Sequence, residues 1–138
     1  MIFTKSIKIK TKGECSILDI SKYIEDAVSE SKLNNGIITV FVTGSTAAIS
    51  TIEYEEGLLD DFSKVLERIA PRDAYYKHEE RWHDDNGHSH IRASLIGSSL
   101  TIPFINKEVM LGRWQQVILI ELDTKPRDRN IIIQIMGE

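Results

Sequence analysis

The chain begins with a stretch, residues 2–10, in which apolar and polar positions alternate. A period of two is typical of a strand with one buried face. Phe3, Ile7 and Ile9 share the more apolar face, which should point toward the core. We therefore predict a strand over residues 2–10.

Two later stretches repeat their apolar residues at helical spacing. The first begins near Ser21, a favourable N-cap residue, and is followed by the stop signal Asn34-Asn35-Gly36. The second covers residues 57–70 and ends at Pro71. The pattern predicts one helix in each place.

The remaining segments read as strands and one long loop. Residues 37–42 form a continuous, β-branched apolar run, which predicts a strand buried on both faces. No period is evident from Pro71 to Ser89, and a loop of this length is usually functional or disordered. Four further strands are predicted after it, over residues 90–96, 99–105, 109–122 and 129–136.

This order of elements predicts an α+β fold with mixed or antiparallel sheets and two helices. The length of 138 residues suits one domain, so we expect a single domain over residues 1–138. The second half should form an antiparallel meander.

Composition narrows the classes of partner. The net charge of -4 argues against general binding to nucleic acid or anionic lipid, because phosphate backbones attract clustered Lys and Arg. The longest apolar run, Val117 to Ile120, is too short to cross a membrane, and the N-terminal stretch lacks the pattern of a secretory signal. We therefore expect a cytoplasmic protein. The single cysteine, Cys15, is expected to be an ordinary thiol.

All four histidines lie within thirteen residues, from His78 to His90. If a strand starts near Ser89, His88 and His90 share one face about 7 Å apart and could hold one ion together. His78 or His83 would supply a third imidazole, with Asp84 and Asp85 as carboxylate options. The alternative is a polar turn whose histidines lie on the surface.

Two further groups of residues could bind anions or act in catalysis. Gly44, Ser45 and Thr46 follow the buried run 37–42, and their backbone amides could form an anion-binding nest; a simple turn is the alternative. Arg127 and Arg129 could bind phosphate or pair with a carboxylate.

The strand predicted over 109–122 places a carboxylate on a largely apolar face. Glu121 shares that face with Gln115 and must either form an ion pair or serve as an acid, base or ligand.

Several motifs in matching order resemble the YjbQ-like family, described as secondary thiamine-phosphate synthases. They extend from about residue 36 to the C-terminus and comprise GSTAA at 44–48 with Glu53, Asp60-Asp61, Tyr76 with His78, Asn86 to His90, GSSLTIPF, LGRWQQVILIELD, PRDR and the closing GE. The chain departs from the family pattern at Gly44, where many members have a histidine. This makes His88 a candidate to compensate.

The resemblance implies an α+β fold, a homotrimer and a weak transferase activity. That activity would join hydroxymethylpyrimidine pyrophosphate to thiazole phosphate and release pyrophosphate. The resemblance also implies a polar, metal-capable pocket around His78, Asn86 and His90.

These expectations give a set of site candidates for a small phosphorylated metabolite. His78, His88 and His90 would hold a divalent metal, zinc or magnesium. Gly44, Ser45, Thr46, Arg127 and Arg129 would bind phosphate. Glu121, Gln115 and Asn86 are the catalytic candidates. The alternatives are a metal-dependent hydrolase of a small metabolite, with Glu121 or Asp85 as base, and a non-catalytic module that binds a small ligand or metal.

Overall fold

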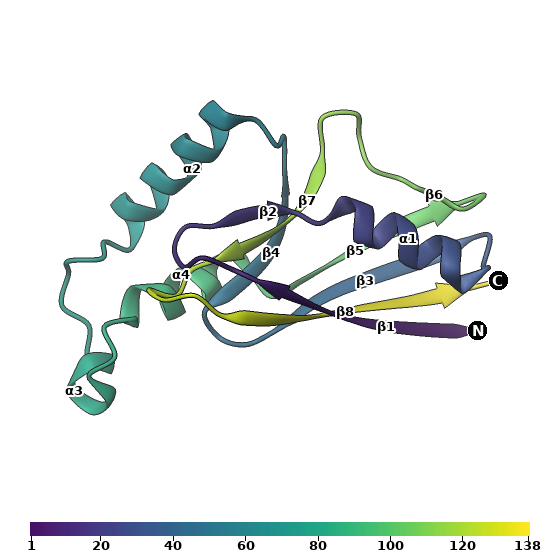
Figure 1. The fold of residues 1–138 in the computed structure, drawn as a ribbon. Helices are drawn as coiled ribbons and strands as arrows, with labels where there is room; N and C mark the ends of the chain where they lie inside the picture. The colour runs from purple at the N-terminus through teal and green to yellow at the C-terminus, as the bar shows by residue number, and fades with distance from the viewer.

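Two antiparallel sheets and four helices build the protein in the computed structural model, which describes all residues 1–138 (Figure 1). The elements in chain order are β1 (Ile2–Lys10), β2 (Ile17–Asp19), α1 (Ser21–Ser31), β3 (Gly36–Thr43), β4 (Ala47–Ile52), α2 (Glu56–Ile69), α3 (His78–Trp82), α4 (Gly87–Ile96), β5 (Ser99–Ile105), β6 (Glu108–Val109), β7 (Gln116–Glu121) and β8 (Asp128–Gly137). The α+β fold is as the sequence predicts, with two more helices than expected.

The larger sheet has the strand order β1-β8-β3-β5-β6. One of its faces forms the main core, which includes Ile38 and Val40 of β3 and Ile133 of β8, all fully buried. The opposite face is open, and Ile37 and Phe41 of β3 are 43% and 39% exposed there. The prediction that the run 37–42 is buried on both faces is therefore wrong.

The core face of this sheet is covered by α1 and by the smaller sheet. Helix α1 buries Ile24, Ala27 and Val28, which lie at helical spacing. The N-cap residue is Ile20 and not Ser21 as predicted, so Ser21 is the first residue of the helix. The Ser21 amide donates a hydrogen bond to Asp19 Oδ1.

The smaller sheet has the order β2-β7-β4 and contains the most deeply buried strand. All five residues of β7 after Gln116 are buried. The single strand predicted over 109–122 is divided into β6 and β7. The loop between them is closed by Gln115, whose Oε1 accepts a hydrogen bond from the Gly112 amide.

Helix α2 lies to one side of the sheets in Figure 1. Only Leu66 of this helix is buried, while Val65 and Ile69 of the same stripe are 41% and 59% exposed. Glu55 caps the helix by accepting hydrogen bonds from the amides of Gly57 and Leu58.

The segment after Pro71 differs most from the prediction. Residues 78–82 form the short helix α3, and residues 87–96 form α4 where a strand was predicted over 90–96. The buried residues of α4 include Ser89, Arg92 and Ala93, a helical spacing of three and four. Two of these are polar, so the apolar pattern in the sequence did not reveal the helix. No helix of the protein is both long and apolar enough to span a bilayer.

Candidate histidine site

The structure brings His78, Asn86 and His90 together at the start of α4. The imidazole rings of His78 and His90 have their centroids 4.5 Å apart and are tilted by 58°. His78 Nε2 lies 3.1 Å from Asn86 Oδ1 and 3.3 Å from Asp84 Oδ1. Three residues that the sequence singled out therefore meet, although from two short helices and not from a strand.

His88 does not join them, which corrects the argument that placed it beside His90. Because both residues are in α4, their side chains point about 200° apart at ~100° per residue. His88 is 1% exposed, and its Nε2 lies 3.0 Å from Glu14 Oε2. The histidine left at the surface is His83, which follows α3 in the left-handed region.

The chain contains no group of three or more His, Cys, Asp or Glu side chains arranged to hold a metal ion. The expected set of His78, His88 and His90 is thus not assembled. His78 and His90 are the two members that lie close together. This chain does not bring the three histidines together, and the metal itself stays a prediction.

The surroundings of His90 favour a neutral imidazole. Partial burial lowers the pKa of His90, and the neighbouring His78 lowers it further, against the opposing effects of Asp84 and Asp123. A neutral imidazole can accept a proton or bind a metal ion. Next to it in sequence, Ser89 Oγ is the one buried side-chain polar atom without a hydrogen-bond partner.

The turn between β3 and β4 and His90 line the same cavity. This cavity has a volume of about 330 Å³ and is lined by Gly44, Ser45, Ala47, His90, Ala93, Ser94, Gly97 and Ser98. The backbone N-H groups of Gly44, Ser45 and Thr46 donate no hydrogen bond within the chain. Three successive free amides are what an anion-binding turn requires.

Arg129 and Glu121 form a buried ion pair behind this turn. Arg129 Nε donates to Glu121 Oε2 at 2.7 Å and Nη2 donates to Glu121 Oε1 at 2.5 Å. Nη2 also contacts the carbonyl oxygen and Oγ1 of Thr46. Glu121 is fully buried and accepts further hydrogen bonds from Thr11 Oγ1 and the Asp123 amide. The sequence left open whether Glu121 forms an ion pair or acts in catalysis; in the structure its carboxylate is fully engaged.

Asp123 extends the ion-pair network to Arg127. Its carboxylate contacts Arg127 Nη2 at 2.8 Å and accepts a hydrogen bond from Thr46 Oγ1 at 3.1 Å. Burial alone would raise the pKa of Asp123, but hydrogen bonds from the Thr124 amide and Arg127 lower it overall. Arg127 is therefore held by a carboxylate at the rim of the network.

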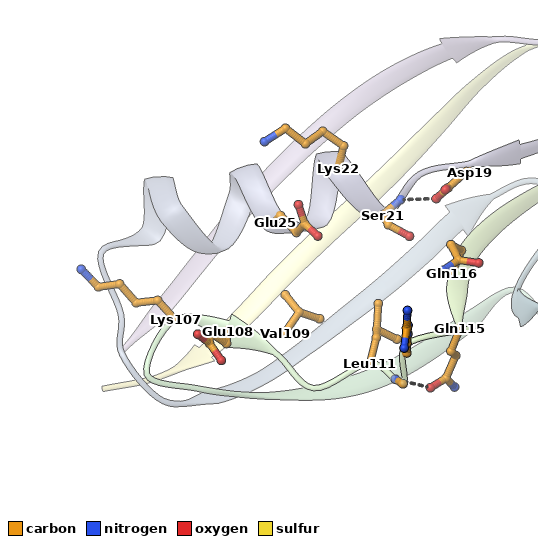
Figure 2. Close-up of a pocket in the computed structure, with 12 residues that line it drawn as sticks. Asp19, Ser21, Lys22, Glu25, Lys107, Glu108, Val109, Leu111, Gln115 and Gln116 are labelled. Carbon is orange, nitrogen blue, oxygen red and sulfur yellow. Dashed lines mark hydrogen bonds between the residues drawn. The ribbon is translucent and has the colours of Figure 1, made fainter. Parts of the chain in front are cut away.

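Gln115 belongs to another part of the molecule. It lines a larger, open cavity of about 770 Å³ between the N-terminal end of α1 and the loop that follows β6, shown in Figure 2. Its side chain is occupied by Gly112 and Thr51. The structure therefore does not bring Gln115 to the histidines, and a catalytic role beside them is not supported by its position.

A second buried network was not foreseen from the sequence. Glu14 lies between His88 and Arg92, and Arg92 is itself 3% exposed and donates to Glu67 Oε2 at 2.7 Å. Burial raises the pKa of the neighbouring Cys15 thiol, which disfavours the reactive thiolate. The local sequence gave no signal for these contacts, because they join residues far apart in the chain.

Comparisons with known proteins agree on one family. A family model described as "UPF0047 protein YjbQ-like" matches residues 5–138. A UPF0047 protein of Methanothermobacter thermautotrophicus is 37% identical over 137 residues, which is 99% of this chain and 94% of the relative.

Solved structures extend the likeness to the whole fold. A YbjQ-like protein of unknown function from Sulfolobus solfataricus superposes with a TM-score of 0.90 at 31% identity, with both chains covered completely. A hypothetical protein from Aeropyrum pernix gives a TM-score of 0.91 at 30% identity, with 99% of each chain covered.

Proposed function

Because the chain belongs to the UPF0047 YjbQ-like family, we propose that it is a weak transferase of the thiamine-phosphate synthase kind, acting on small phosphorylated metabolites. The observation that supports this is the cavity that His90 lines together with Gly44 and Ser45, two residues of the turn 44–46 whose three backbone amides are free. One side offers imidazole and the other offers donors for an anion.

The proposed reaction joins hydroxymethylpyrimidine pyrophosphate to thiazole phosphate. The thiazole nitrogen forms a bond to the methylene carbon of the pyrimidine, and the bond from that carbon to the pyrophosphate oxygen breaks. The attacking nitrogen is already neutral, so no strong protein base is needed. What the site must supply is stabilisation of negative charge on the leaving pyrophosphate.

The residues of this chain divide that task. The amides of Gly44, Ser45 and Thr46 would donate to pyrophosphate oxygens. Asn86, which is buried and contacts His78, would keep that imidazole oriented toward His90. Glu121 would act indirectly, by holding Arg129 against Thr46.

The site can hold a divalent ion only with fewer protein ligands than expected, because two of the three histidines lie together. The imidazoles of His78 and His90 are the two candidate ligands, with ring centroids 4.5 Å apart and the Asp84 carboxylate 3.3 Å from His78. Imidazole suits zinc better than magnesium. When bound, such an ion would neutralise part of the charge on the leaving pyrophosphate. The two histidines would hold it, while His88 would take no part.

The test is formation of thiamine phosphate by the purified chain from the two precursors, with magnesium or zinc supplied. The chain should be expressed in a host that lacks its own thiamine-phosphate synthase, so that no copurified enzyme contributes. We expect product with the wild type and a loss of at least about tenfold with His90→Ala, since one charge-assisted contact is worth about 1.5–3 kcal/mol. His83→Ala is the matched control, because His83 is exposed and follows α3. The absence of product with either metal would contradict the proposal.

A metal-dependent hydrolase is the second candidate, favoured by the position of Asp84 3.3 Å from His78. A carboxylate beside an imidazole can serve as a base toward water. Metal analysis by inductively coupled plasma mass spectrometry, combined with a panel of phosphorylated metabolites, separates the two. Zinc at about one ion per chain with hydrolytic turnover would favour the hydrolase. Tight ligand binding without any turnover would instead indicate a non-catalytic module.

A further inference from the structure

Gly44 leaves an opening, a space without a side chain, at the surface of the cavity that His90 lines. Its φ of +133° lies in the region that favours glycine, and a Cβ atom placed on it would lie 2.9 Å from Arg129 Nη1. Gly44 itself lines the cavity. The absence of a side chain at Gly44 therefore leaves space between the cavity and Nη1 of the buried Arg129, which lies behind the lining residues.

That nitrogen has no partner in the chain. Arg129 uses Nε and Nη2 to bind Glu121 and Thr46, and Nη1 makes no hydrogen bond. Ser89 Oγ is the one side-chain polar atom that is sealed from solvent without a partner, so Nη1 keeps contact with solvent. A guanidinium has five N-H donors, and the two on Nη1 are left for a ligand.

The donors around this opening favour a negatively charged oxygen group. The free amides of Gly44, Ser45 and Thr46 belong to the turn beside which Nη1 lies. None of the residues that line the cavity is acidic, and the Asp123 carboxylate beside Thr46 is paired with Arg127. Glu121 balances part of the charge of Arg129, but its carboxylate lies against Nε and Nη2 and not against Nη1. A phosphoryl or carboxylate oxygen is the group that such donors bind.

We propose that Gly44 is a specificity-determining residue, which opens the cavity so that Arg129 Nη1 and the turn amides bind an anionic oxygen group of the ligand. Arg129 thus has two functions: its Nε and Nη2 hold the ion-pair network together, and its Nη1 binds the anion. The inference rests on the proposed function for one point only, the identification of that group as the pyrophosphate of the substrate.

The chain offers a matched control for testing this opening. Gly97 also lines the cavity and also has a positive φ, +104°, but a Cβ atom there would meet nothing within 4 Å. Gly97→Ala therefore strains the backbone in a similar way and leaves Nη1 untouched. Gly44→Ala adds the same strain and also closes the opening.

The experiment is isothermal titration calorimetry of the full chain with sodium pyrophosphate, inorganic phosphate or acetate, without divalent ions. We expect Gly44→Ala to weaken pyrophosphate binding by about tenfold or more, the value of one charge-assisted hydrogen bond, while Gly97→Ala stays within about threefold of the wild type. Stronger binding of pyrophosphate and phosphate than of acetate would identify a phosphoryl subsite, and the reverse order a carboxylate subsite.

Three outcomes would overturn the proposal: no binding of any of the three anions to the wild type, equal binding by Gly44→Ala and the wild type, or equal losses in both glycine variants. If Gly44→Ala does not fold, Arg129→Lys replaces it, because lysine keeps a positive charge beside Glu121 but has no second nitrogen to reach the cavity. Anion binding is measured without the second substrate, so its result stands whether or not the chain makes thiamine phosphate.

Discussion

At the scale of single residues, the ion-pair network around Glu121 holds the ends of four strands together. Thr11 follows β1, Thr46 precedes β4, Glu121 ends β7 and Arg129 lies near the start of β8. All four are buried. Charges in such a place are stable only when every partner is present.

Removing one partner should therefore be costly. We expect Glu121→Gln to lower the free energy of unfolding by about 3–5 kcal/mol, because the Arg129 guanidinium is left buried without its counter-charge. Urea denaturation followed by tryptophan fluorescence measures this. Asp60→Asn, which breaks the exposed pair with Lys64, is the control and should leave the urea midpoint unchanged. Equal midpoints for the two variants would contradict the role given to Glu121.

Asp123 gives the network a dependence on pH. The pKa of Asp123 is lower in the folded chain than in the unfolded one, so the unfolded chain binds its proton first as the pH falls. The stability from Asp123 is complete above the unfolded value, ~3.9, and is lost as the pH falls through the folded value.

The corresponding variant is Asp123→Asn, which should cost about 1–3 kcal/mol of unfolding free energy at pH 7 through weaker hydrogen bonds to Arg127 and Thr46. Below about pH 4 the difference from the wild type should shrink. Urea denaturation at intervals from pH 7 to pH 3 tests this. A difference that stays constant over that range would show that the charge of Asp123 does not stabilise the fold.

At the scale of elements, α4 decides the geometry of the site. As a strand it would have pointed Ala93 and Leu95 to one core face. As a helix it buries Ala93, which is 7% exposed, and leaves Leu95 63% exposed. The two descriptions make opposite statements about Leu95.

Lysine substitutions separate them. Leu95→Lys should leave the melting temperature nearly unchanged, because the side chain already faces outward. Ala93→Lys should prevent folding or lower the melting temperature by more than about 10 °C, because it places an unpaired charge among apolar side chains that include Ala48 and Ile118 of the smaller sheet. Circular dichroism during thermal unfolding measures both. A large loss with Leu95→Lys would contradict the helix.

Helix α4 also shows which elements can be predicted from the sequence pattern and which cannot. The strand over 2–10, both long helices and the strands near 99–105 and 129–136 were predicted, because each has an apolar face of regular period. Helix α4 was missed because two of its buried positions hold the polar residues Arg92 and Ser89. Arg92 donates a hydrogen bond to the carbonyl oxygen of Ala70, and Ser89 Oγ has no hydrogen-bond partner. The convergence of His78, Asn86 and His90 agreed with the family motifs. The exclusion of His88 depended on Glu14, 74 residues away, which no local pattern indicates.

At the scale of the whole molecule, the open face of the larger sheet carries apolar side chains in register. Phe41 pairs with Ile132, and Ile37 pairs with Met136 on the neighbouring strand. Met136 on β8 and Ile2 on the edge strand β1 pair with each other and are 49% and 62% exposed. Such a face is typical of a surface that another chain covers.

The resemblance to the family implies a homotrimer, and this face is where we expect the copies to meet. Sedimentation equilibrium should therefore give three times the mass of 15.7 kDa for the wild type. Phe41→Lys should shift the distribution to the monomer, because it buries an unpaired charge in the contact. Leu95→Lys, on a different exposed surface, is the control. A monomeric wild type would contradict the trimer, and a trimeric Phe41→Lys would contradict this choice of face.

The position of β8 has a consequence for how the protein is made. Strand β8 lies between β1 and β3 in the larger sheet, so the N-terminal strand finds its only neighbour in the last eleven residues. During synthesis β1 has no partner in the sheet until β8 has also left the ribosome, and its backbone hydrogen-bonding groups stay unpaired until then. The larger sheet can therefore be completed only after β8 has been made, through contacts between residues far apart in the sequence, which are slow to form.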